Sequence, residues 1–99
     1  MERITLSYQA KSLLKKRTHV GVVGSGDLEI LMEPNEEKKA NVLIRTGTEG
    51  YTPTWEAVLE RFFAKHDLAA SIEINDFGAT PGVVQLRLEQ AWEASRINE

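Results

Sequence analysis

The chain has 99 residues, 41% of them apolar and 27% charged, with a formal net charge of −3. This length suits one small domain with a modest core, and the charge balance gives no general attraction to nucleic acid. There is no cysteine, which excludes disulfides and thiolate metal sites, and no apolar run approaches the ~20 residues of a membrane span.

Three further features of the sequence predict a cytoplasmic, single-domain protein without a metal site. The N-terminus, Met1 to Thr5, lacks the basic and then apolar stretch of a signal peptide, so we expect the cytoplasm as its location. No cluster of His, Asp or Glu has the spacing of a metal site, so we expect no metal. Without a repeat or a linker, residues 1–99 are expected to form a single domain.

The first half of the chain alternates apolar and polar residues, as strands do. Strands are expected over residues 4–8, 20–23, 28–33 and 41–45. Pro34 stops the third of these, and residues 9–19 form a basic loop or one helical turn after the first. Because the connections are short, we expect these early strands to pair antiparallel.

The second half changes to a helical period. Apolar residues three, four, seven and eight positions apart predict one helix: Trp55, Val58, Leu59, Phe62 and Phe63. Thr52 is expected to cap it and Pro53 to begin it. A strand follows over 71–75. Thr80 and Pro81 repeat the start signal for a second helix, which runs to about Ser95.

These elements predict an α+β fold. Each helix has one apolar stripe that must pack on something, and the simplest partner is the sheet. We therefore expect a two-layer α/β sandwich, with a mainly antiparallel sheet of four to five strands and two helices on one face. Trp55, Phe62, Phe63 and Trp92 are expected in its core.

Ser25 is the residue most suggestive of function. It lies between Gly24 and Gly26, with strand-like residues on both sides, so its hydroxyl should project from a hairpin tip. The simplest interpretation is only a good turn, in which Asp27 either bonds its own backbone or orients the Ser25 hydroxyl. The alternative is a point of covalent attachment, which needs an exposed hydroxyl with room for another enzyme's active site.

Two catalytic motifs do not fit Ser25. A P-loop needs a lysine and a hydroxyl residue opening a helix, whereas a strand-like run follows here. A nucleophile elbow needs glycines two residues away, where Val23 and Asp27 stand. Nothing in the spacing places His19 or His66 as a base beside Ser25.

Two segments resemble one known family. Residues 22–31, Val-Val-Gly-Ser-Gly-Asp-Leu-Glu-Ile-Leu, closely resemble the modification segment of the acyl carrier (delta) subunit of bacterial malonate decarboxylase. Residues 75–84, Asn-Asp-Phe-Gly-Ala-Thr-Pro-Gly-Val-Val, followed by Leu86–Gln90, resemble its C-terminal signature. Together they cover roughly a quarter of the chain, and their joint occurrence in order is more specific than either alone.

The resemblance implies a carrier without catalytic groups. In this family the serine matching Ser25 carries 2′-(5″-triphosphoribosyl)-3′-dephospho-CoA through a phosphodiester bond, which brings the thiol that this chain lacks. Acetyl and malonyl thioesters on that group serve the conversion of malonate to acetate and CO2. The implied partners are the acyl transferase and decarboxylase subunits and a dedicated prosthetic-group transferase.

Several alternatives stay open at this stage. The carrier subunit of citrate lyase uses a similar group, although residues 76–82 favour malonate decarboxylase. The chain can also be a protein-interaction module with no prosthetic group, or a small enzyme with Ser25 as nucleophile.

Two further groups of residues have two interpretations each. Asp76, Gly78 and Pro81 either shape a strand-to-helix turn or contact other subunits. The basic residues of segment 11–17 either attract the phosphates of the prosthetic group or an acidic partner surface, or they are simply solvated: Lys11, Lys15, Lys16 and Arg17.

Overall fold

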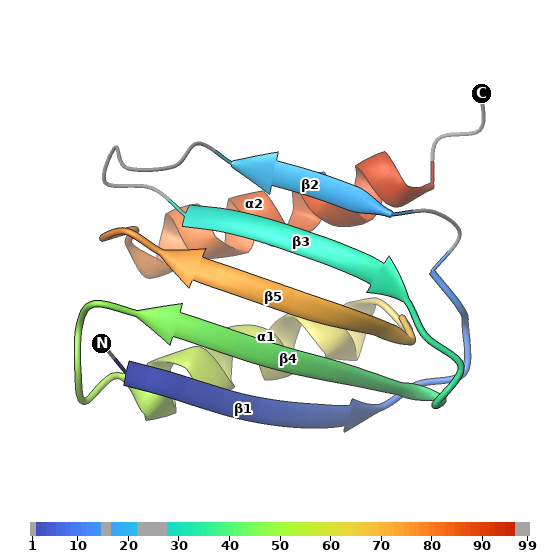
Figure 1. The fold of residues 1–99 in the computed structure, drawn as a ribbon, viewed down its shortest axis with the longest axis horizontal. Coiled ribbons are helices and arrows are strands. Elements are labelled where there is room, and N and C mark those ends of the chain that lie inside the picture. Colours follow the sequence, from blue (N-terminus) through green and yellow to red (C-terminus); the bar gives the residue numbers. More distant parts are fainter. Residues whose placement is uncertain (1, 15–16, 22–27, 97–99) are drawn as a thin grey trace.

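The protein is a two-layer sandwich in the computed structural model, which describes residues 2–14, 17–21 and 28–96. A five-stranded sheet forms one layer, and two helices cover one of its faces (Figure 1). The elements are β1 (Glu2–Gln9), β2 (Thr18–Gly21), β3 (Leu28–Pro34), β4 (Lys39–Thr46), α1 (Thr52–Lys65), β5 (Ala70–Asp76) and α2 (Pro81–Ser95). The predicted α+β class and layering are confirmed.

The order of the strands differs in part from the order in the chain. The sheet runs β1–β4–β5–β3–β2, with β4 and β5 parallel and every other neighbouring pair antiparallel. The expected antiparallel pairing of the early strands is confirmed for β2 with β3 and for β1 with β4, whereas β1 does not lie beside β2 and β3 does not lie beside β4. The reason lies in β5, which enters the centre of the sheet, between β3 and β4, and pairs through both edges.

The core lies between the sheet and the two helices. Side chains alternate along the strands, so that one face of each central strand is buried beneath the helices. The helices add one stripe each, namely Trp55, Val58, Leu59 and Phe62 from α1, and Val84, Leu88 and Ala91 from α2. Phe63 and Trp92 are only partly buried at the margins, so their predicted core position is confirmed in part.

The two helix starts differ. Thr80 caps α2 as predicted, since its hydroxyl accepts a hydrogen bond from the Val83 amide at 3.4 Å. The predicted Thr52 cap of α1 is wrong. Thr52 is the first helical residue, and Tyr51 precedes it with φ −104° and ψ 16°, outside the helical region and without a side-chain cap. Pro53, which has no amide hydrogen, then occupies the first turn. Neither described helix is long and apolar enough to cross a membrane.

Residues 10–14 of the connection between β1 and β2 form a loop without a helical turn. Leu13 forms a parallel bridge with Ala69, just before β5. Asp67 anchors the segment: one carboxylate oxygen accepts the Lys11 amide at 2.8 Å, and the other accepts the Ser12 amide and hydroxyl, both at 3.2 Å. These bonds, the Lys11 amide first, lower the pKa of Asp67 below its ordinary value of 3.8.

A matched pair of leucines in α2 tests the assignment of the core. Leu88 is fully buried, whereas Leu86 on the same helix is 53% exposed. We expect Leu88→Ala to lower the free energy of unfolding by about 2–5 kcal/mol, because it leaves a cavity. The control Leu86→Ala should change it by no more than about 0.5 kcal/mol. Urea denaturation measures both, and equal losses would contradict this packing.

Asp67 makes stability depend on pH in a defined direction. Because folding lowers its pKa, the carboxylate stabilises the fold fully above its unfolded-state pKa, and this contribution disappears as pH falls through the folded-state value. The difference in unfolding free energy between wild type and Asp67→Asn should therefore be constant above about pH 5 and shrink below it. Urea unfolding from pH 6 to pH 2 tests this, and a difference that does not change with pH would refute it.

Candidate functional site

The predicted attachment segment joins two neighbouring antiparallel strands. Gly24, Ser25, Gly26 and Asp27 lie outside the described residues, but the strands on both sides are described. Gly21 of β2 pairs with Glu29 of β3 in antiparallel register. Segment 22–27 therefore connects adjacent strands, as a hairpin connection does. The type of turn and the exposure of Ser25 stay predictions.

The segment starts and ends at one end of the sheet, here called the Asp76 end. The strands β2, β4 and β5 finish there and β3 begins there (Figure 1). Leu28, at the start of β3, is the register partner of Asp76. The two segments that carried the family resemblance, far apart in sequence, thus lie side by side.

Asp76 organises the turn from β5 into α2. Only 8% of it is exposed. One carboxylate oxygen accepts the amides of Gly78 at 3.0 Å and Ala79 at 2.9 Å, and the other accepts the Thr46 hydroxyl at 2.8 Å. These bonds close the turn and connect it to the neighbouring strand β4.

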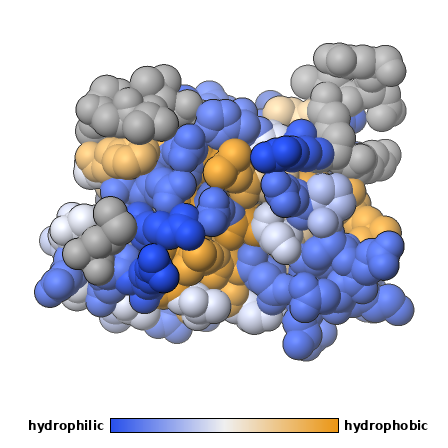
Figure 2. All heavy atoms as spheres, viewed as in Figure 1, coloured by the Kyte–Doolittle hydropathy of each residue, from blue (hydrophilic) through white to orange (hydrophobic). Residues whose placement is uncertain are grey.

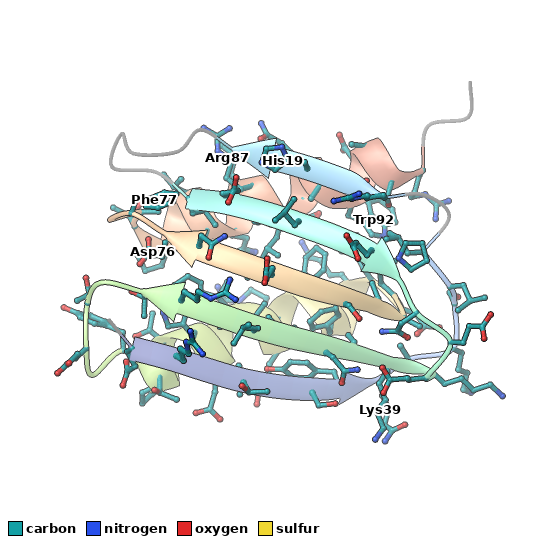
Figure 3. The ribbon with its side chains drawn as sticks, viewed as in Figure 1. His19, Lys39, Asp76, Phe77, Arg87 and Trp92 are labelled. Atoms are coloured by element: carbon teal, nitrogen blue, oxygen red, sulfur yellow. The ribbon has the colours of Figure 1, made fainter. Side chains whose placement is uncertain are left out.

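Gly78 and Pro81 each suit this turn. Gly78 has φ +114°, in the left-handed region that favours glycine. Pro81 begins α2, where a missing amide hydrogen is harmless. The structure therefore supports the role of these residues and Asp76 in shaping the turn, and contact with other subunits stays a prediction. Phe77, between Asp76 and Gly78, is 37% exposed at the same end (Figure 3).

A cavity of about 250 Å³ opens at the Asp76 end, where the two helices begin. Its buried lining comes from α1, α2 and the ends of β4 and β5, and its exposed margin from the connections. Its polar and aromatic lining residues include Thr46, Thr48, Tyr51, Thr54, Trp55 and Asp76. This cavity was not predicted from the sequence. Trp55 has the same helical periodicity as a core residue, and only the placement of two separate helices makes the hollow.

The basic segment lies at the opposite end of the sheet, here called the Lys39 end. Arg17 precedes β2 there and pairs with Glu33 at 3.2 Å, with both side chains exposed. Lys11 is exposed near Asp67, beside the start of β5. Segment 22–27 follows the far end of β2, so Lys11 and Arg17 lie away from it, which favours solvated charges over phosphate contacts. Lys15 and Lys16 lie outside the described residues.

Both histidines have carboxylate partners. His66, after α1 at the Lys39 end, contacts Glu89 of α2 at 2.8 Å and stacks on Trp92, with ring centroids 3.9 Å apart. His19 of β2 contacts Glu29 at 2.9 Å. Hydrogen bonds from Asn75 first and His19 second lower the pKa of Glu29. The His66 contacts therefore join the end of α1 to α2, and the His19 contact joins β2 to β3.

The face of the sheet opposite the helices is open. An apolar strip crosses its middle between polar borders (Figure 2), over a shallow hollow of about 400 Å³ that includes Leu31 and Leu43. Arg45 of β4 pairs with Glu73 of β5 across this face at 3.0 Å. Within the described part of the chain, no group of three His, Cys, Asp or Glu residues is arranged to hold a metal ion.

Comparisons with known proteins agree with this arrangement. The family model for the malonate decarboxylase delta subunit matches residues 15–95. A "malonate decarboxylase acyl carrier protein" of Azotobacter vinelandii is 45% identical over 94 residues, covering 94% of this chain and 95% of the relative. The protein of the same name from Pseudomonas syringae pv. tomato is 47% identical with the same coverage.

A solved structure is also similar. One chain of a crystal structure of a Pseudomonas malonate decarboxylase hetero-tetramer in complex with malonate superposes with a TM-score of 0.90 at 43% identity. The match covers 96% of this chain and 99% of that one, so fold and length both agree. The family match spans both segments singled out above, together with the helices and strands between them. This chain therefore belongs to the malonate decarboxylase delta subunit family.

Proposed function

We propose that this chain is the acyl carrier of a malonate decarboxylase complex and that Ser25 is the residue to which its prosthetic group is attached. The observation that carries the proposal is the position of Ser25. It stands in the segment that resembles the family's modification segment, inside the range that the family model matches, and this segment is a six-residue connection between two paired strands. The named relatives are acyl carrier proteins and the similar structure is a hetero-tetramer, which supports a carrier working among other subunits.

The attachment step needs only the Ser25 hydroxyl from this chain. The donor form of the group is 2′-(5″-triphosphoribosyl)-3′-dephospho-CoA, and the Ser25 oxygen attacks the phosphorus that is bonded to the 5″ oxygen of its added ribose, so that only one of the three phosphates stays on the loaded chain. A phosphodiester bond forms, the bond to the second phosphorus breaks, and pyrophosphate leaves. The hydroxyl proton passes to a base of the transferase or to water. No base from this chain is required, which agrees with both described histidines being held by carboxylates.

The chain itself supplies a rigid body for the group. When bound, the group would supply a thiol for acetyl and malonyl groups, chemistry that a chain without cysteine cannot provide. The strands on both sides of segment 22–27 are fixed in the sheet by β3–β5 and β2–β3 pairing. A tether on such a body raises the local concentration of its cargo to roughly the mM range. Acyl transfer and decarboxylation would then belong to the partner subunits.

The mass of the intact protein tests the attachment. After co-expression with the enzymes that make and transfer the prosthetic group, we expect the wild-type chain to gain the mass of the donor less pyrophosphate. Ser25→Ala should gain nothing, because the attacking oxygen is gone. The matched control Ser71→Ala removes an exposed hydroxyl on β5 and should still be loaded fully.

The same measurement separates the alternatives. Equal added mass on wild type and Ser25→Ala would place the attachment elsewhere. No added mass on wild type, with full activity of a complex that contains Ser25→Ala, would indicate an interaction module. Turnover by the isolated, unmodified chain would indicate an independent enzyme. Loading by a citrate lyase transferase but not by a malonate decarboxylase transferase would indicate the other carrier type.

A further inference from the structure

We propose that the cavity at the Asp76 end binds the adenine of the attached prosthetic group. This contact would fix the protein-proximal part of the arm against the protein. The proposal rests on the proposed function, because it concerns the group carried by Ser25. It assigns a purpose to residues that the carrier role leaves unused, above all Tyr51 and the threonines around it.

The cavity lies within reach of the attachment point. Three residue steps separate Ser25 from Leu28, which span at most about 10 Å. Leu28 is paired with Asp76, which lines the cavity, at a typical Cα separation of about 5 Å. In the donor, the phosphoribosyl unit joins the 2′ oxygen of the adenosine. The adenine is therefore near the protein end of the arm, and the thiol is at its free end.

The size of the cavity fits one part of the arm. Its volume of about 250 Å³ lies below the range of roughly 300–1,000 Å³ that is usual for whole drug-sized ligands. It can therefore take a single planar base but not the complete nucleotide and its pantetheine chain. The cavity also opens to solvent along its Tyr51 and Thr48 margin, so the rest of the arm can leave it.

The lining suits a purine. Tyr51 is 52% exposed at the margin, where its ring can stack on a base, while Trp55 is 6% exposed beneath. The hydroxyls of Thr48 and Thr54 can donate to or accept from ring nitrogens. These groups are neutral and flat or small, as recognition of a nucleobase requires.

Asp76 favours the base over the other parts of the arm. Its carboxylate has about four acceptor positions, and three hydrogen bonds occupy three of them. The remaining position on the oxygen that faces Thr46 can accept the exocyclic amino group of adenine. The same negative charge repels phosphates and a malonyl carboxylate, so these stay outside the cavity.

Weak binding of the adenine is enough to keep it in the cavity for much of the time. A tether of this length gives an effective concentration of roughly mM, so a site with a dissociation constant near 1 mM would be about half occupied in the loaded protein. With the base held, the arm would pivot from the cavity margin instead of from Ser25. The thiol end would then sweep a smaller volume, beside the end of the sheet from which it starts.

Nuclear magnetic resonance of the full ¹⁵N-labelled chain provides the test. The two tryptophans give separate indole signals. Trp55 lines the cavity, and Trp92 lies near the Lys39 end of α2 as an internal reference (Figure 3). On loading of the arm, verified by intact mass, we expect the Trp55 signal to shift and the Trp92 signal to stay. Unchanged Trp55 and Tyr51 signals in a fully loaded protein would overturn the proposal while leaving the attachment at Ser25 intact.

A matched pair of aromatic variants sharpens the result. Tyr51→Ala removes the stacking ring, whereas Phe77→Ala removes an exposed aromatic ring at the same end that does not line the cavity. We expect the Trp55 signal of loaded Tyr51→Ala to return towards its unloaded position, and that of Phe77→Ala to behave as wild type. Unloaded spectra of both variants establish that each is folded. The reverse pattern would place the base at Phe77 and refute the cavity.

Free compounds identify the part of the arm that binds. Added to the unmodified chain, dephospho-CoA and adenosine should both shift the Trp55 signal at millimolar concentration, and pantetheine should not. Tyr51→Ala should weaken adenosine binding about tenfold or more, as expected for loss of a stacked ring. Binding of pantetheine alone, or a shift in the loaded protein that requires acetylation, would show that the cavity takes the acyl end and would overturn the proposal.

Discussion

The parallel pairing of β4 with β5 is the constraint on which the rest of the structure depends. The two strands run in register from Ala40 beside Ala70 to Thr46 beside Asp76. Parallel neighbours need a crossover, and α1 provides it across one face of the sheet. Because both strands finish at the same end, both following helices begin there, and the cavity forms between their first turns.

The Asp76 carboxylate links the parts that this pairing brings together. It bonds β4 through Thr46 and the start of the α2 connection through Gly78 and Ala79. The segment that contains Ser25 leads into the neighbouring strand β3, whose first residue, Leu28, is the register partner of Asp76. The strand ends that flank the predicted attachment segment, the turn and the cavity thus share one end of the molecule, while the paired charges of Arg17 and Glu33 lie at the other.

A carrier of this kind holds its attachment residue on a different structural element from a carrier built on a helical bundle. Here the proposed attachment residue belongs to a connection between sheet strands, and hydrogen bonds of the sheet hold both sides of that connection. At the opposite end, His66, Glu89 and Trp92 hold the end of α1 to α2. The body is therefore secured at both ends, and the open sheet face with Leu31 and Leu43 remains accessible to other molecules.

The period of the apolar residues was enough to predict the elements and the layer arrangement. Alternation along 28–33 and the stripe from Trp55 to Phe62 each depend on local geometry, which a sequence expresses directly. The Thr80 cap was predictable for the same reason. The Thr52 cap was wrong by one position, because α1 already begins at Thr52 and Tyr51 takes the capping position without a side-chain hydrogen bond. Ser25 was singled out by its glycine neighbours and by resemblance.

The pairing order and the cavity could not be predicted in this way. Alternation shows which face of a strand is buried, but it does not show which strand lies beside it, so the insertion of β5 between β3 and β4 was missed. The meeting of Leu28 with Asp76 is a long-range contact of the same kind. The cavity depends on the separation of two helices on the sheet, a distance set by packing of the whole core and not by any one segment.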